Sequence, residues 1–258
     1  MRQILRELVQ YRDHIATAFW QDFRSMYRGT FFGVTWNVVL PLAPVLLYTL
    51  LAQRRVLPVF DGVNPSSYVA LGATIWFLLA SCVQQPLQIV QSRNAEVMKT
   101  ALPLSAMVVS GFAQILFDAL IRMMFVIGII ALTGTSVKLT LLWLPLVLVP
   151  AVLLSLGTGL ILGIANLIYS DVGRVTGIFI QYGLFISGVI FPLSSLPFSE
   201  ILKWNPFYFF IEEARVLSFQ GVPENLPSLG IFTALAIAIF LLGCRVFYVM
   251  EYRVRGIA

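Results

Sequence analysis

The residues best placed to do chemistry are Asp118 and Arg122, which stand four positions apart in a long apolar segment. Ionisable groups in such a segment are functional candidates, because each is costly to bury alone. At this spacing opposite charges share one helix face and can neutralise each other, whereas a proton relay needs an unpaired carboxylate. We therefore favour a structural ion pair over a coupling-ion site.

Other catalytic arrangements are excluded by the residue types present. The chain has one histidine, His14, and two cysteines, Cys82 and Cys244. They cannot form a Ser-His-Asp, HExxH or CxxC constellation. The phosphate-binding pattern GxxxxGK[ST] is absent, and the spacing of Gly159 and Gly163 in an apolar run indicates close helix packing instead. We expect no enzyme activity, and neither a cofactor nor a metal in this chain.

The composition indicates what kind of protein must position these residues. Hydrophobic residues make up 59% of the chain, charged residues only 11%, and the mean hydropathy is +0.89. Soluble domains have about a quarter of their residues charged. The apolar stretches have the length of helices, and alternating strands typical of a barrel are missing. The sequence predicts an all-α integral membrane protein with one transmembrane domain over residues 1–258.

The pattern of apolar runs predicts a surface helix, six spans and a broken external segment. Apolar residues recur every three or four positions over residues 3–27, as in a helix that lies in the membrane interface. We assign residues 1–30 to this helix, spans one to five to 31–193, and span six with a tail to 228–258. Prolines break segment 194–227, which is expected to hold short re-entrant helices near Ser199–Trp204 and Phe207–Phe219. The six spans are predicted at 31–53, 67–90, 105–133, 140–168, 172–193 and 228–250.

Lysine and arginine placement predicts the orientation. These residues are concentrated on the side that holds both termini and segment 91–103. Such an excess marks the cytoplasmic side of a membrane protein. Both termini are therefore expected in the cytoplasm, and segment 194–227 outside.

A joint between the surface helix and the first span contains Gly29, Gly33 and Pro41. Glycine tolerates the dihedral angles of a sharp turn, and a proline inside a span can kink it. We interpret this segment as a flexible gate joint. The alternative is a plain spanning helix preceded by an unstructured basic segment.

Segment 91–103 is polar and ends at a proline, so it could form a short cytoplasmic helix that docks a soluble partner. The alternative, a solvated loop, is favoured by the sequence alone because charged runs usually just face water. The candidate docking residues are Arg93, Asn94, Glu96 and Lys99.

Four motifs follow one another along the chain. They are Gly33-Val-Thr-Trp36 with Pro41, Asn94-Ala-Glu96 with Lys99 and Pro103, Phe191-Pro192-Leu-Ser-Ser-Leu-Pro197, and Trp204-Asn205-Pro206. In this order they resemble the membrane subunit of bacterial ABC exporters for capsular polysaccharide, O-antigen or teichoic acid. The resemblance spans nearly the whole chain and agrees with its length and six-span layout.

The resemblance implies a homodimer in the bacterial inner membrane, working with two copies of a soluble ATP-binding subunit that carries ATP and magnesium. Periplasmic export proteins are further possible partners, and nucleic acid is not expected. The polymer channel would form between the two copies, chiefly from spans one and five. Segment 91–103 and the N-terminal helix would contact the ATPase. The outer mouth would be gated by segment 194–227 and its flank, with Pro192, Pro197, Asn205 and Pro206 as candidates.

A sugar polymer needs a channel with flat aromatic faces and scattered amide or hydroxyl groups. Spans one and five offer such side chains, although most aromatics of a membrane protein fill its core or its interface belts. Asn37 and Gln181 are the strongest candidates, because polar residues within a span are costly against lipid. The full candidate set is Trp36, Asn37, Tyr48, Gln181, Tyr182, Phe185 and Ser187.

Two alternative functions stay open. One is an ABC permease of the same fold that exports a drug or a small lipid. The other is a proton-coupled carrier or a membrane scaffold, which the lack of unpaired carboxylates in the spans disfavours. Dependence on a partner ATPase separates the carrier from both exporters.

Overall fold

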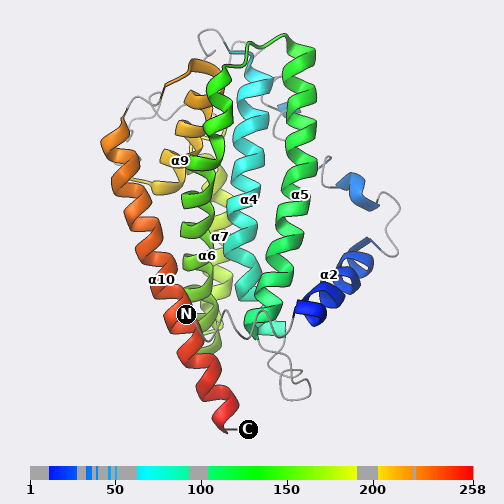
Figure 1. Ribbon diagram of the computed structural model, residues 1–258, viewed down its shortest axis with the longest axis vertical. Helices are drawn as coiled ribbons and strands as arrows, with labels where there is room; N and C mark the ends of the chain where they lie inside the picture. Colours follow the sequence, from blue (N-terminus) through cyan, green and yellow to red (C-terminus); the bar gives the residue numbers. More distant parts are fainter. Residues whose placement is uncertain are drawn as a thin grey trace.

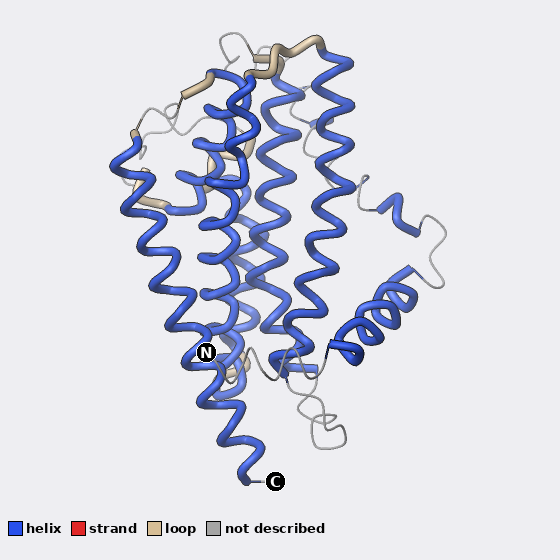
Figure 2. Tube along the Cα trace, in the orientation of Figure 1, coloured by secondary structure: helices blue, strands red, loops and turns tan. Residues whose placement is uncertain are grey.

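The computed structural model describes residues 12–27, 33–36, 39, 46, 47, 50, 63–92, 104–190, 203–222 and 225–257. In these segments the regular structure is entirely helical, with turns between the helices (Figure 2). The predicted all-α class is confirmed for this part of the chain.

Four helices of the described segments are long and apolar enough to cross a membrane, and they form an upright bundle (Figure 1). They coincide with the predicted second, third, fourth and sixth spans, and they make this an integral membrane protein. The predicted first span, 31–53, lies mostly outside the described residues. The four helices are α4 (Pro65–Ser92), α5 (Leu104–Thr133), α6 (Leu144–Ile168, preceded by the 3₁₀ turn η2, Leu139–Trp143) and α10 (Leu226–Ile257).

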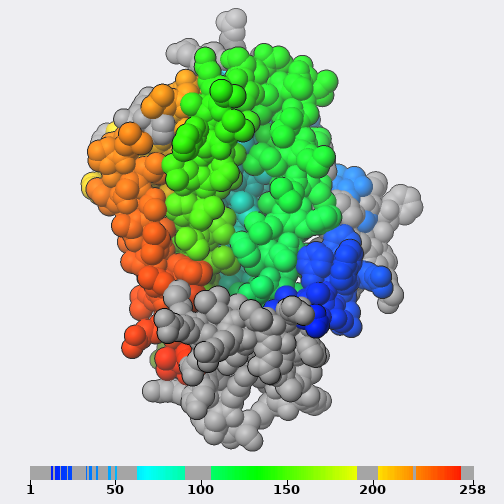
Figure 3. All heavy atoms as spheres, viewed as in Figure 1, coloured from blue at the N-terminus to red at the C-terminus, as the bar shows by residue number. Residues whose placement is uncertain are grey.

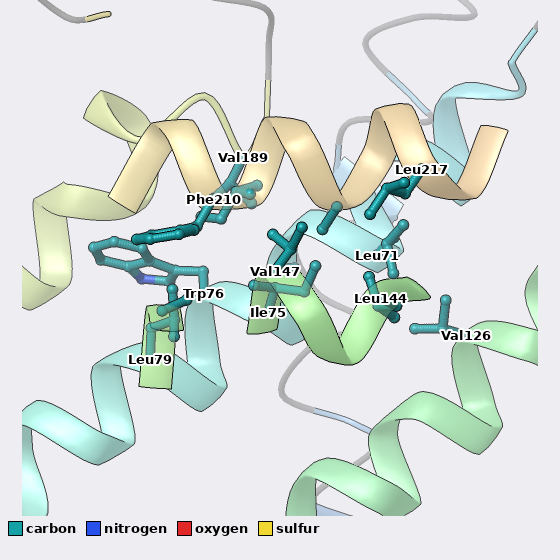
Figure 4. Packing of buried hydrophobic residues seen from close by; sticks show 14 of the residues in the cluster. Leu71, Ile75, Trp76, Leu79, Val126, Leu144, Val147, Val189, Phe210 and Leu217 are labelled. Atoms are coloured by element: carbon teal, nitrogen blue, oxygen red, sulfur yellow. The ribbon is translucent and has the colours of Figure 1, made fainter. Parts of the chain in front are cut away.

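Helix α4 is the centre of the bundle. In its most apolar stretch 83% of the residues are buried, compared with 6% in α5. Leu71, Ile75 and Leu79 of α4 share one core with Val147 of α6 and Phe210 from the segment after α7 (Figure 4). The outer face seen in Figure 3 is made largely by α5, α6 and α10.

Helices α4 and α6 approach closely at two glycines. A Cβ atom at Gly159 would lie 2.6 Å from the carbonyl oxygen of Val83, and one at Gly163 would lie 3.2 Å from that of Pro86. Small residues at such contacts let backbones meet where lipid supplies no hydrophobic drive for association. The predicted packing role of this glycine pair is confirmed.

The described part of the N-terminal helix is α2 (Arg12–Tyr27), which lies beside the lower part of α5 (Figure 1). The ring of Phe23 meets that of Phe117 on α5 edge-on, with 5.1 Å between centroids. A 3₁₀ turn, η1 (Gly33–Thr35), follows.

Helix α7 (Asp171–Ile186) is shorter than the predicted fifth span, 172–193. Its 16 residues extend about 24 Å at 1.5 Å per residue, less than the roughly 30 Å of a bilayer core. It ends where Gly188 takes a φ of +64°, a left-handed conformation that commonly terminates helices. The chain therefore turns before a full span is complete.

The segment before α10 contains the short helix α9 (Pro206–Arg215) and a π-helical turn, η4 (Val216–Gln220). They correspond to the predicted piece Phe207–Phe219. Of the other predicted piece, only residues 203 and 204 are described, and they form a turn. Helix α9 lies across α4 and α6 and buries Phe210 completely between them (Figure 4).

Candidate functional site

Helix α7 turns one face toward the bundle and the other away from it. A Cβ atom at Gly183 would lie 2.5 Å from the indole ring of Trp76, so this face packs directly on α4. Three predicted channel residues are exposed on α7: Gln181, Tyr182 and Phe185. One helix thus presents an amide and two aromatic rings on its outward surface.

An apolar cavity of about 790 Å³ lies between α4, α6 and α7. Its walls include Trp76 of α4, Thr158 of α6 and Phe179 of α7. Ser187, a predicted path residue, and Asn205, a predicted residue of the outer gate, are also part of its lining. Its size and apolar lining suit an aliphatic chain or a similar apolar group.

Asn205 and Pro206 begin α9 and attach it to the end of α7. The side-chain oxygen of Asn205 accepts a hydrogen bond from the backbone N–H of Phe207 at 3.0 Å, as an N-cap residue does. Pro206 occupies the first helical position, where its missing N–H is not needed. The amide nitrogen of Asn205 donates to the hydroxyl of Ser187 at 3.3 Å. The structure therefore brings together two residues that the sequence assigned to different predicted sites.

A smaller, polar hollow of about 290 Å³ adjoins the apolar cavity, since Thr176 and Ile180 line both. Gln84 and Gln88 of α4 border it, opposite Arg174 of α7. The Arg174 guanidinium lies 3.5 Å from the carboxylate of Asp171, and both side chains are exposed. The apolar cavity and the polar hollow together line one side of α7, with apolar residues in the cavity and polar residues in the hollow.

A buried cluster around Arg215 was not predicted from the sequence. Only 2% of the Arg215 side chain is exposed, at the end of α9. Its Nη1 atom donates to the carbonyl oxygen of Gly188, and its Nη2 atom to that of Val189, each at 2.7 Å. Tyr68 of α4 lies under the guanidinium, 3.6 Å from the ring centroid to Cζ.

Glu212 completes this cluster. Its Oε2 atom accepts one hydrogen bond from Arg215 Nη1 and one from the Tyr68 hydroxyl, both at 3.1 Å. The sequence placed Arg215 and Glu212 in an external segment, where a solvated pair is the natural expectation. The only signal in the sequence was their i, i+3 spacing within an otherwise apolar stretch.

The structure describes only part of the gate joint and of the first span, namely Gly33 and Trp36 among the predicted residues. Gly33 has a φ of +50°, a left-handed angle that favours glycine, at the first residue of η1. Trp36 follows and is 44% exposed. In the described part of one chain, η1 lies with α2 beyond α5, whereas α7 packs on α4 and α6 (Figure 1). Trp36 therefore does not join the α7 residues within a single chain.

The remaining predicted residues lie outside the described segments, so their roles stay predictions. They are Gly29, Asn37, Pro41 and Tyr48 near the first span, Arg93, Asn94, Glu96 and Lys99 of the docking segment, and Pro192 and Pro197 of the external segment.

Asp118 is buried, and the Arg122 guanidinium carbon lies 5.6 Å from the ring centroid of Phe77 on α4. Arg122 is thus directed toward α4 rather than toward lipid. This direction suits a charge kept within the protein. The proposed ion pair between the two side chains stays a prediction.

Comparison with known proteins decides the family. Residues 13–219 match the ABC-2 type transporter family. The chain belongs to this family. It is also 23% identical, over 90% of each chain, to the O-antigen export system permease protein RfbA of Klebsiella pneumoniae. The protein of the same name from Myxococcus xanthus is 21% identical, again over 90% of each chain. The predicted resemblance to polysaccharide exporter permeases is confirmed, and the chain is a transporter membrane component rather than an enzyme.

Proposed function

We propose that this protein is the permease subunit of an ATP-driven exporter that moves a lipid-linked polysaccharide, O-antigen or capsular polymer, across the bacterial cytoplasmic membrane. The observation that carries the proposal is the similarity to two O-antigen export permeases over 90% of each chain. One shared segment would not produce a similarity that extends over nearly the whole of each chain. The energy would come from ATP and magnesium on a separate ABC subunit.

The geometry of α7 supports a path that forms between two copies. Gln181 is exposed, and an amide facing lipid is costly, so a polar lumen or a second chain is the better environment. Tyr182 and Phe185 are 56% and 46% exposed, and such rings suit the apolar faces of sugars. Trp36 lies away from α7 within one chain, so a path lined by both requires a partner copy.

Docking of the ATPase is proposed for segment 91–103 and the N-terminal helix. Exchanging the charges with Glu96→Lys and Lys99→Glu should weaken recovery of the complex, because charged groups set partner choice at such interfaces. Co-purification of the two subunits measures this effect. Unchanged recovery of the complex and unchanged ATP hydrolysis would favour the alternative interpretation of segment 91–103 as a solvated loop.

The apolar cavity keeps a second candidate open, namely an exporter of the same family for a small lipid or drug. A volume of about 790 Å³ between α4, α6 and α7 suits an amphiphile as well as the lipid end of a polymer. Both candidate functions need an ABC ATPase subunit, so only the transported molecule distinguishes them.

Deletion of the gene, with complementation by the full chain, tests the proposed function. Loss of surface polysaccharide together with lipid-linked polymer accumulating inside the cell is the expected result. Normal surface polymer combined with increased drug sensitivity or altered lipid export would overturn it in favour of the second candidate.

A further inference from the structure

We propose that Arg215 is a positioning residue that fixes the end of α7 to α9 and α4, so that these elements move as one rigid unit during transport. The structural part of this inference stands on contacts within the chain, while its role in transport rests on the proposed function.

The need for such a residue follows from the turn after α7. A buried backbone carbonyl in an apolar region needs a hydrogen-bond donor. Gly188 and Val189 are buried in the turn that follows Ser187, the C-cap of α7, and both of their carbonyl oxygens accept hydrogen bonds from Arg215. A positive charge also suits the negative end of a helix dipole. Arg215 on α9 thus pairs the backbone of the turn that ends α7.

The fork geometry explains why arginine stands here. Its two terminal nitrogens reach two successive carbonyl oxygens at once, at 2.7 Å each, whereas a lysine ammonium is a single point donor. Glu212, one turn earlier on α9, pairs with the guanidinium at 3.1 Å and offsets its charge. The Tyr68 ring below it adds a cation–π contact to α4.

The packing of α4 makes room for the guanidinium. A Cβ atom at Gly72 would overlap the Arg215 side chain, with Cζ only 2.7 Å away. With 2% of its side chain exposed and both terminal nitrogens bonded to the protein, Arg215 is not arranged to bind cargo. The arrangement instead joins three segments that are far apart in the sequence.

One consequence concerns the path surface. Tyr182 and Phe185 stand on the last turns of α7, close to the carbonyls that Arg215 holds. Asn205 adds a second link between α7 and α9 through Ser187. Any movement of α9 at the mouth is therefore transmitted to the aromatic face of α7.

Hydrogen–deuterium exchange of the full chain, purified in nanodiscs with its partner subunit, tests the inference. Arg215→Met should raise exchange of amides in 185–190 and in 207–215 together, by roughly tenfold or more, the factor for losing hydrogen bonds to a charged group. Arg215→Lys should give an intermediate rise, since it keeps the charge but not the fork. Gly72→Ala should reproduce the effect although Arg215 is intact.

Gly177→Ala on α7 is the matched control, because a Cβ atom there meets nothing within 4 Å, and it should leave exchange unchanged. A rise in only one of the two windows, or full restoration by lysine, would overturn the inference. An equal rise in α5 and α10 would also overturn it, because that pattern reports general unfolding. If the windows respond as expected but the wild-type chain exports no polysaccharide, the proposed function fails while the positioning role stands.

Discussion

Removing the Asn205 side chain should destabilise the first turn of α9 and favour local opening of this helix. Asn205→Ala deletes the acceptor for the Phe207 N–H, at 3.0 Å, and the donor to Ser187, at 3.3 Å. Loss of an N-cap costs about 0.5–2 kcal/mol. Loss of a neutral hydrogen bond costs about 0.5–1.5 kcal/mol. Together they lower the free energy of local opening of α9 by about 1–3.5 kcal/mol, which corresponds to an open population about five to four hundred times larger.

Amide exchange over residues 207–214 measures this opening in the purified protein. Asn205→Asp is the matched variant, because a carboxylate keeps the capping acceptor but cannot donate to Ser187. Ser187→Ala removes the same hydrogen bond from the other side and leaves the cap intact. Both variants should therefore show a similar, smaller increase in exchange than Asn205→Ala.

The pattern among these variants decides whether the reasoning is right. If Asn205→Asp exchanges as fast as Asn205→Ala, the cap contributes nothing and the account of how α9 begins is wrong. If all three variants match the wild type, neither hydrogen bond holds α9 in place.

Three further predictions concern other parts of the fold. Gly159→Val should destabilise the bundle by about 1–3 kcal/mol or more, because the valine side chain would press on the α4 backbone. Gly128→Val is the control, because a Cβ atom there has open space. Thermal unfolding in detergent compares the two variants, and equal melting temperatures would contradict the close approach of α4 and α6. Asp118→Ala or Arg122→Ala alone should reduce the yield of folded protein more than replacing both residues by apolar ones, because a single change leaves the other charge buried without its partner. If Asp118→Asn stops transport in a fully folded protein, a coupling role is the better account. Gly33→Val should cost about 1–2 kcal/mol of backbone strain at a φ of +50°, and it should abolish surface polymer while the complex stays intact. Gly33→Asn should be tolerated, because asparagine adopts left-handed angles more readily. Normal export by the Gly33→Val variant would show that the joint is not a gate.

Several features could be predicted from the sequence because they depend on local constraints. Backbone polar groups inside a bilayer must be paired within the segment, so apolar runs of sufficient length have to be helices. This constraint is why α4, α5, α6 and α10 match their predicted spans. The Trp204-Asn205-Pro206 motif likewise carries its own cap and first helical residue.

The substrate path stays a prediction, because only the exposure of its candidate residues is known. Gln181, Tyr182 and Phe185 are exposed on α7, and the sequence already marks them as polar or aromatic residues in a predicted span. The end of α7 at Ile186 was not predicted, since the apolar run continues past it, whereas the helix ends at Ser187 and Gly188 takes a φ of +64°. The burial of Arg215 was not predicted, because the carbonyl groups that it binds lie 27 and 26 residues away in the chain.

The position of each span in the bundle was decided by the tertiary structure alone. Helix α4 has the lowest mean hydropathy of the four, 1.6 against 2.4 for α5, yet it is the most buried. In water the more hydrophobic helix would be expected at the centre. In a bilayer the lipid is as apolar as a protein core, so hydrophobicity determines that a helix inserts, while small residues and polar contacts determine which helix the others surround.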